Sequence, residues 1–135
     1  MKAWHFLRED KRLGYEDNRL VRTGHTLKCD PDEIKMCVSG FHASKNILDA
    51  MAYAPGPVVC RVELGGRIIG GGDKCVASER TVIYMLDATD ILHEFACWSA
   101  ERALSRIKNP DPRSLAAINA KRQWLRGEIT DAELT

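Results

Sequence analysis

Apolar and polar residues alternate in several short segments of the first two thirds of the chain, and this period of two predicts a β-sheet. Residues 2–7 predict a strand with Trp4 and Phe6 on one face and His5 on the other. Residues 58–64 show the clearest alternation. The apolar side of this strand holds Val58, Cys60, Val62 and Leu64. Weaker strand patterns lie at residues 21–28, 36–44, 75–77 and 81–86.

Glycines mark the expected turns between these strands. Gly65 and Gly66 predict a tight hairpin turn, because glycine adopts positive φ without a steric penalty, and residues 67–69 would then return antiparallel. Residues 70–74 predict a loop, and the polar run 78–80 is expected to interrupt the strand that follows.

Helical spacing appears once inside the sheet region and again in the last third of the chain. Ser44 stands where a helix N-cap is expected, and Pro55 ends that helix, which we expect to have about three turns. Three further helix starts are predicted at Asp87, at Asp111-Pro112 and at the capping box of residues 130–133. Gly127 is the expected stop of the helix before that box.

This order of elements predicts an α+β fold. We expect a mostly antiparallel sheet with one short helix in the N-terminal two thirds, followed by C-terminal helices. The expected organisation is a core domain over residues 1–109 and a helical appendage over residues 110–135 that depends on the core.

Composition narrows the class of protein. Of the 135 residues, 44% are hydrophobic and 29% are charged, which is typical of a soluble globular domain. Twenty basic and nineteen acidic residues give a net charge of +1, which disfavours a general nucleic-acid backbone binder. No apolar run approaches the ~20 residues of a membrane span. Five cysteines without a signal segment indicate reduced thiols and a cytoplasmic protein, and we expect Cys60, Cys75 and Cys97 to be small buried residues.

Common chemical motifs are incomplete in this sequence. Asp73 separates Lys74 from the glycines before it, so the run at 70–74 does not match a phosphate-binding P-loop. The chain has neither a Cys-x-x-Cys nor a His-x-x-x-His pair, and we expect no metal site. A Gly-x-Ser-x-Gly nucleophile elbow is absent, whereas a Cys/His pair that meets only in space stays open.

The segment from Gly40 to Tyr53 is the most informative for function. It places His42, Ser44 and Tyr53 around a strand-to-helix junction, where polar and aromatic side chains can line a cleft. The alternative is structural: Ser44 caps the helix, and the two aromatic side chains are half-buried and hydrogen-bonded.

Together with His5 and the run from Val59 to Gly65, this segment resembles the NAD-binding core of ADP-ribosyltransferases over residues 2–86. The resemblance is nearest to the poly(ADP-ribose) polymerase and diphtheria-toxin branch, and it places Tyr53 at the offset of the stacking tyrosine. It implies that NAD is the cofactor and that a host macromolecule is modified.

The resemblance also implies a role for each site residue. His5 would hold the ribose and adenine side of NAD, Tyr53 would stack on nicotinamide, and His42 and Ser44 would border the pocket. Arg61 or Arg80 would contact a phosphate. By chain order, Glu79 would be the catalytic glutamate that stabilises an oxocarbenium-like ribose.

A second resemblance covers most of the chain. The opening KAWHFL, the box GFHAS and the run from Asp49 to Gly56 are similar to small proteins encoded by phages and prophages. This resemblance implies an accessory protein that acts in the host bacterial cytoplasm, for example against host defences.

Two other functions stay open. Without a secure glutamate, the same fold would be a non-catalytic binder that sequesters a nucleotide signal or inhibits a host protein. The basic residues of the C-terminal helices would also suit nucleic acid or an acidic partner, although a solvated helical face is the favoured interpretation. These residues are Arg102, Arg106, Lys108, Arg113, Lys121, Arg122 and Arg126.

Overall fold

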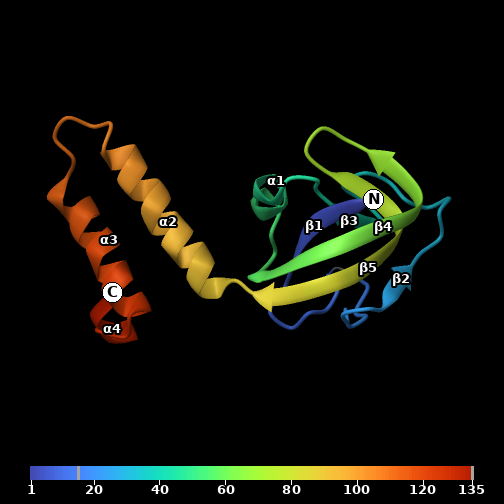
Figure 1. The fold of residues 1–135 in the computed structure, drawn as a ribbon, viewed down its shortest axis with the longest axis horizontal. Coiled ribbons are helices and arrows are strands. Elements are labelled where there is room, and N and C mark those ends of the chain that lie inside the picture. Colours follow the sequence, from blue (N-terminus) through green and yellow to red (C-terminus); the bar gives the residue numbers. More distant parts are fainter. Residues whose placement is uncertain (15, 135) are drawn as a thin grey trace. The chain divides into compact units, whose positions relative to one another are not determined.

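The computed structural model describes residues 1–14 and 16–134, and the chain divides into two compact units, Met1–Asp87 and Ala88–Thr135 (Figure 1). The first unit holds the sheet, and the second is helical. The boundary follows Asp87 rather than residue 109, because the long helix that starts at Thr89 packs against the helix after it.

An antiparallel sheet forms the N-terminal unit, as the sequence predicted. Within the described residues its strands are β1 (Lys2–Leu7), β2 (Thr26–Lys28), β3 (Phe41–Ala43), β4 (Val58–Gly70) and β5 (Cys75–Asp87). β4 lies between β1 and β5, while β2 and β3 pair with different stretches of β5. With the helices, this arrangement confirms the α+β class.

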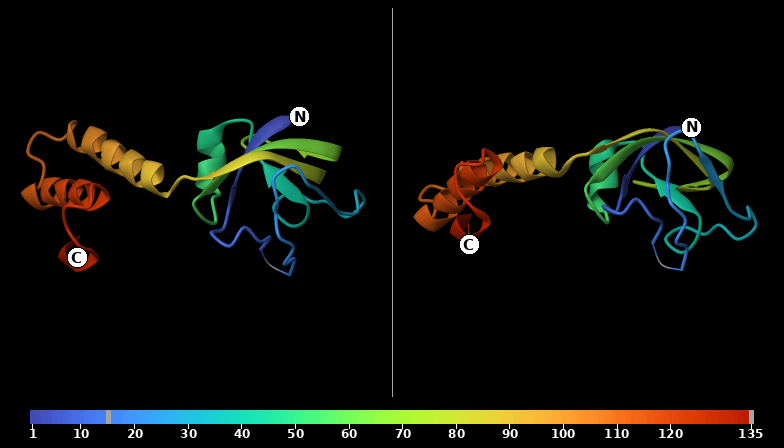
Figure 2. Two further views of the ribbon diagram at one scale, coloured as in Figure 1. Left: turned by 60° about the horizontal axis from the view of Figure 1, so that its bottom comes forward. Right: turned by 90° about the horizontal axis from the view of Figure 1, so that it is seen from below.

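The sheet curls until its two sides nearly meet. Just after β3, the Ser44 N–H donates to the Trp4 carbonyl at 2.9 Å, and the Trp4 N–H donates to the Ser44 carbonyl at 2.7 Å. This bridge joins the end of β3 to β1 and bends the sheet around its interior. Figure 2 shows the curved sheet, with the blue segment that follows β1 projecting to one side.

The predicted hairpin at Gly65 and Gly66 is wrong. β4 continues through both glycines to Gly70, and the chain reverses before Cys75. The glycines form a bulge: Gly66 has a φ of +66°, and the Arg67 N–H donates to the Ser78 hydroxyl at 2.9 Å. A glycine pair permits a turn or a bulge, and here pairing with the uninterrupted β5 selects the bulge.

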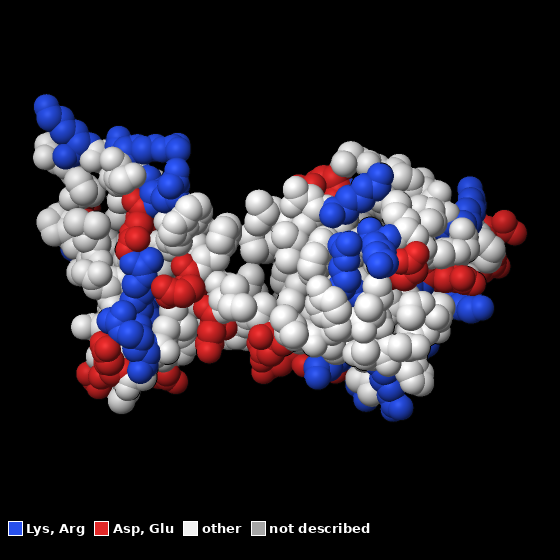
Figure 3. Space-filling view, viewed as in Figure 1, with Lys and Arg blue, Asp and Glu red and all other residues white. Residues whose placement is uncertain are grey.

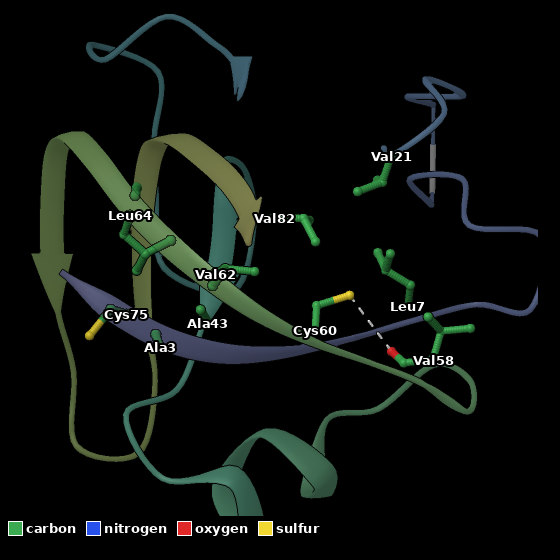
Figure 4. Close-up of a cluster of buried hydrophobic side chains, with 11 residues drawn as sticks. Ala3, Leu7, Val21, Ala43, Val58, Cys60, Val62, Leu64, Cys75 and Val82 are labelled. Carbon is green, nitrogen blue, oxygen red and sulfur yellow. Dashed lines mark hydrogen bonds between the residues drawn. The ribbon is translucent and has the colours of Figure 1, made fainter. Parts of the chain in front are cut away.

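The core lies on the inner side of the curled sheet (Figure 4). The predicted apolar side of β4 is buried there together with Ala3 and Leu7 of β1. The Cys60 thiol donates to the Val58 carbonyl at 3.9 Å, so this cysteine behaves as a small core residue. Burial is also confirmed for the other two cysteines expected inside, Cys75 and Cys97.

The short helix α1 (Ile47–Ala52) begins later than predicted. Its N-cap is Asn46, whose side chain accepts the Leu48 N–H at 2.8 Å. Ser44 does not cap this helix, because its backbone is already bonded to Trp4 in the sheet.

The patterns at residues 21–28 and 36–44 give strands that are shorter than predicted, β2 and β3. The patterns at residues 75–77 and 81–86 join into the single strand β5, so the predicted interruption at residues 78–80 is wrong.

The C-terminal unit contains α2 (Thr89–Leu104), α3 (Pro112–Leu125) and α4 (Asp131–Leu134). The predicted Asp111 cap is confirmed, since its side chain accepts the Arg113 N–H at 2.9 Å. Thr130 and Glu133 form the predicted capping box. The N-cap of α2 is Ala88 instead of Asp87, because β5 extends through Asp87.

Candidate functional site

A cleft of about 810 Å³ opens in the N-terminal unit. Its walls come from β1, β3, the segment after β1, the turn before β3 and the end of α1. Five of the residues that the sequence singled out line it together: His5, His42, Ser44, Tyr53 and Arg80. The curl of the sheet explains this grouping, because it brings β1, β3 and β5 around one interior.

Arg61 and Glu79, the other two predicted site residues, do not line this cleft. Each is next in sequence to a buried strand residue, so alternation directs it to the outer face of the sheet. The Arg61 guanidinium lies 4.6 Å from the centre of the Trp4 ring, and the Glu79 carboxylate lies 3.3 Å from the Lys28 ammonium. The structure therefore does not bring Glu79 to the residues with which it was expected to act.

Arg80 is the most unusual side chain of the cleft. It is 4% exposed and pairs across the sheet with Leu64, a core residue. Its Nη1 donates to the His42 carbonyl at 2.9 Å, and its guanidinium lies 5.2 Å from the centre of the Phe41 ring. Within the described part of the chain, no carboxylate forms an ion pair with it. Burial lowers the pKa of Arg80 to about 10.

Two histidines stand beside this cation. Burial, then Arg80, then His42 lower the pKa of His5 well below its usual value. Burial, then Lys74 and Arg80, lower the pKa of His42. The Cys37 N–H donates to His42 Nε2 at 2.9 Å, which requires an unprotonated nitrogen there. Both rings are therefore neutral near pH 7, and Arg80 supplies the charge.

Tyr53 stands at the mouth of the cleft and is 49% exposed. Its hydroxyl donates to the Asp73 carboxylate, and this hydrogen bond is the main cause of the raised pKa of Tyr53. The Lys74 ammonium lies 4.0 Å from the centre of the tyrosine ring, within cation–π range. A positive charge therefore already sits against one aromatic surface of the site.

The charge of the cleft is positive although the chain is nearly neutral. Among described residues its lining holds five basic side chains, Arg8, Arg12, Arg19, Lys74 and Arg80, and two acidic ones, Glu16 and Asp17. Asp17 is already paired with Arg19 at 2.8 Å. The lining has the electrostatics of a site for anions.

The fold and the cleft lie within a stretch that matches a known family model. Residues 1–94 match the model described as a domain of unknown function, DUF7666. The chain belongs to the DUF7666 family. No curated protein and no solved structure matches the chain. The match spans every residue of the cleft, so the cleft lies within the DUF7666 domain of this chain.

Sequence reasoning missed part of the DUF7666 cleft. Arg12 and Arg19 come from the segment after β1, for which the sequence predicted no site residue, and Cys37 comes from a turn that was expected to be strand. Arg80 itself carried a signal. If alternation is continued through residues 75–87, Arg80 falls in phase with Val82, which places a charge on a core-facing position.

The helices of the C-terminal unit do not present a uniformly basic face. Three of the basic residues that the sequence singled out form ion pairs. Arg113 pairs with Asp111, Arg122 with Glu94 and Glu101, and Arg126 with Glu128. Figure 3 shows acidic side chains interleaved with basic ones over this unit. In the described residues, no helix is long and apolar enough to cross a membrane, and no group of three or more His, Cys, Asp or Glu is placed to hold a metal ion.

Proposed function

We propose that the DUF7666 cleft binds a phosphorylated nucleotide and holds it without chemical change. The observation that carries this proposal is Arg80, a buried cation that lines a positively charged cleft and has no carboxylate partner among the described residues.

A guanidinium has five N–H donors. Among the described residues, Arg80 uses one of them, in its hydrogen bond to the His42 carbonyl. A buried charge without an opposite charge is unfavourable, and a phosphate would relieve that cost through bidentate, charge-assisted hydrogen bonds. The neutral histidines beside Arg80 add neutral donors and acceptors suited to ribose hydroxyls.

Tyr53 supports a particular kind of base. An exposed tyrosine ring at a cleft mouth offers a stacking surface. The Lys74 ammonium against that ring would repel the positively charged nicotinamide of NAD⁺ but not a neutral adenine. We therefore favour an adenine nucleotide such as ADP-ribose or ADP over NAD⁺.

Binding is favoured over catalysis because of where the carboxylates lie. Glu79 faces away from the cleft, and the carboxylates in its described lining are Glu16, which is exposed, and Asp17, which is neutralised by Arg19. A carboxylate beside the ribose would stabilise the charge that develops when the nicotinamide bond breaks, and both lining carboxylates come from the segment after β1 and not from the strands that hold His5 and Arg80. In the predicted phage setting, the ligand would be a nucleotide signal of the host that the protein sequesters.

The direct test is calorimetric titration of the full chain with ADP-ribose. Arg80→Met should weaken binding by at least about tenfold, as expected for loss of a charged hydrogen bond. Arg61→Met is the matched control, because it removes an arginine from the outer face of the same sheet, and it should leave the affinity unchanged. If Arg80→Met is poorly folded, Tyr53→Ala, at an exposed side chain, should weaken binding instead. Absent binding, or equal losses in the Arg61 and Arg80 variants, would overturn the proposal.

ADP-ribosyl transfer remains a second candidate function, favoured by the shared position of His5 and Tyr53 in the cleft. The test is release of nicotinamide from labelled NAD in the presence of a bacterial lysate. We expect none. Release that disappears in Tyr53→Ala, with label moving to a lysate component, would establish a transferase.

A further inference from the structure

Cys37 differs from the other cysteines of the chain. All five are among the described residues and all are free; Cys37 is the exposed one, Cys29 is partly buried, and the other three are buried. The φ of Cys37 is +65°, a left-handed conformation that is uncommon for a residue with a side chain. Its backbone is held by the hydrogen bond from its N–H to His42 Nε2.

Cys37 shares the cleft with a cation. Cys37 and Lys74 both line it, and interaction with the Cys37 side chain is the main cause of the raised pKa of Lys74. A cysteine attacks electrophiles as its thiolate. Lys74 also contacts the ring of Tyr53, which keeps the ammonium at the cleft mouth.

An independent feature indicates what approaches this thiol. Arg80, in the same cleft, is a buried cation without a carboxylate partner in the described residues, and Arg12 adds positive charge to the lining. The field of such a cleft raises the local concentration of anions. A reagent that is both anionic and reactive toward thiolates is therefore drawn to Cys37.

We propose that Cys37 is a site of covalent modification by small anionic disulfides. The Cys37 thiolate attacks one sulfur of the disulfide, a new S–S bond forms to Cys37 Sγ, and the other half leaves as a thiolate. The exchange is balanced without a further oxidant. The modification places a negatively charged group at the mouth of the cleft and competes there with a nucleotide.

Cys29 provides the comparison within the same cleft. Burial raises the pKa of Cys29, so less of it is thiolate at neutral pH. We therefore expect the folded protein to be modified at Cys37 and not at Cys29.

The test compares two disulfides on the native full chain: dithiobis(nitrobenzoate), which is dianionic, and dithiodipyridine, which is neutral. Absorbance gives the rates, and peptide mapping gives the site. The ratio of the reaction rate with the anionic disulfide to that with the neutral disulfide should be higher for the folded protein than for the same chain in urea.

Lys74→Met should lower that ratio by about fivefold, the size expected for one exposed charge contact. Lys45→Met removes an exposed lysine outside the cleft and should not change it.

Cys37→Ser should abolish the fast reaction, and Cys29→Ser should retain it. An unchanged ratio in Lys74→Met, or modification of Cys29 as fast as Cys37, would overturn the proposal. These readouts do not use a nucleotide, so they stand apart from the calorimetry. If ADP-ribose does not bind but Cys37 reacts as described, the proposed function fails and this inference holds.

Discussion

At the scale of single residues, Gly40 determines where His42 stands in the cleft. Its φ is +104°, and a Cβ at this position would lie 2.6 Å from Cγ2 of Val76 and 3.0 Å from Cγ2 of Ile34. The chain therefore enters β3 through a conformation and a space that only glycine fits.

We expect Gly40→Ala to lower the free energy of unfolding by about 3 kcal/mol, through both the backbone conformation and the steric overlap. Gly24→Ala is the matched control. Gly24 has a φ of +81°, but nothing lies within 4 Å of the added Cβ, so its loss should be about 1 kcal/mol. Urea unfolding measures both variants. If Gly40→Ala and Gly24→Ala lower the free energy of unfolding equally, the steric overlap at Gly40 does not contribute to the loss.

The site residues could be predicted from sequence only in part. His42, Ser44 and Tyr53 were singled out by the segment from Gly40 to Tyr53, and His5 and Arg80 by the resemblance to ADP-ribosyltransferases; all five line one cleft. Cys37 and the arginines before β2 gave no signal, because a turn conformation and the path of a long loop depend on contacts distant in sequence. Glu79 was chosen by chain order, which carries no information about which face of a strand a side chain occupies.

The depressed pKa of His5 gives a pH dependence of stability. Burial, then Arg80 and His42, keep the folded ring neutral, whereas the unfolded ring binds a proton below pH 6.5. Between these two pKa values the unfolded state binds more protons, so stability is present above pH 6.5 and falls as the pH is lowered. One such histidine changes the unfolding free energy by up to about 1.4 kcal/mol per pH unit.

We therefore expect the free energy of unfolding to fall less steeply between about pH 6.5 and 5 in His5→Gln than in the wild type. Urea unfolding of both proteins at several pH values measures this. His42→Gln should act in the same direction, because its pKa is lowered too. If the free energy of unfolding depends on pH equally in the wild type and in His5→Gln, His5 is protonated to the same extent in the folded and unfolded states.

At the scale of elements, the long pairing of β4 with β5 depends on the bulge at Gly65 and Gly66. The Ser78 hydroxyl accepts the Arg67 N–H in a partly buried position, so the bulge is tied to a residue eleven positions away. Local sequence favoured a turn there, and this distant contact is why the prediction failed.

The alternation of residues 58–64 and the caps at Asp111 and Thr130 depend on local chemistry, and these predictions are confirmed. The predicted caps at Ser44 and Asp87 are wrong, because both residues are held in the sheet.

Ser78→Ala should lower the free energy of unfolding by about 1–3 kcal/mol, because it leaves the Arg67 N–H without its partner. The control is Thr23→Ala, at an exposed position of the same unit, which should change stability by less than about 0.5 kcal/mol. Urea unfolding measures both. A Ser78 variant as stable as the control would show that water replaces the hydroxyl.

At the scale of the whole molecule, the two units differ in how much they bury. The N-terminal unit has an extended buried core, whereas the buried hydrophobic residues described in the C-terminal unit are Ala88, Cys97 and Ile118. The α+β order of elements was readable from the sequence. The unit boundary was not, because it depends on which neighbours α2 packs against.

We expect amide hydrogen exchange to be slower in β4 and β5 than in α2 and α3, since segments with few buried contacts open more readily. Exchange followed by mass spectrometry on the full chain measures this. Equal or greater protection of the helices would mean that they are stabilised by contacts beyond those within their own unit.

The most direct test of the central claim is to map where a nucleotide contacts the isotope-labelled full chain by NMR. On addition of ADP-ribose, we predict that amide signals shift around the cleft, at Cys37, Gly40, His42 and Tyr53 and at the Arg80 side chain. Signals on the outer face, such as Arg61, and in residues 88–134 should stay in place. No shifts at millimolar ligand, or shifts outside the cleft, would contradict nucleotide binding by this site.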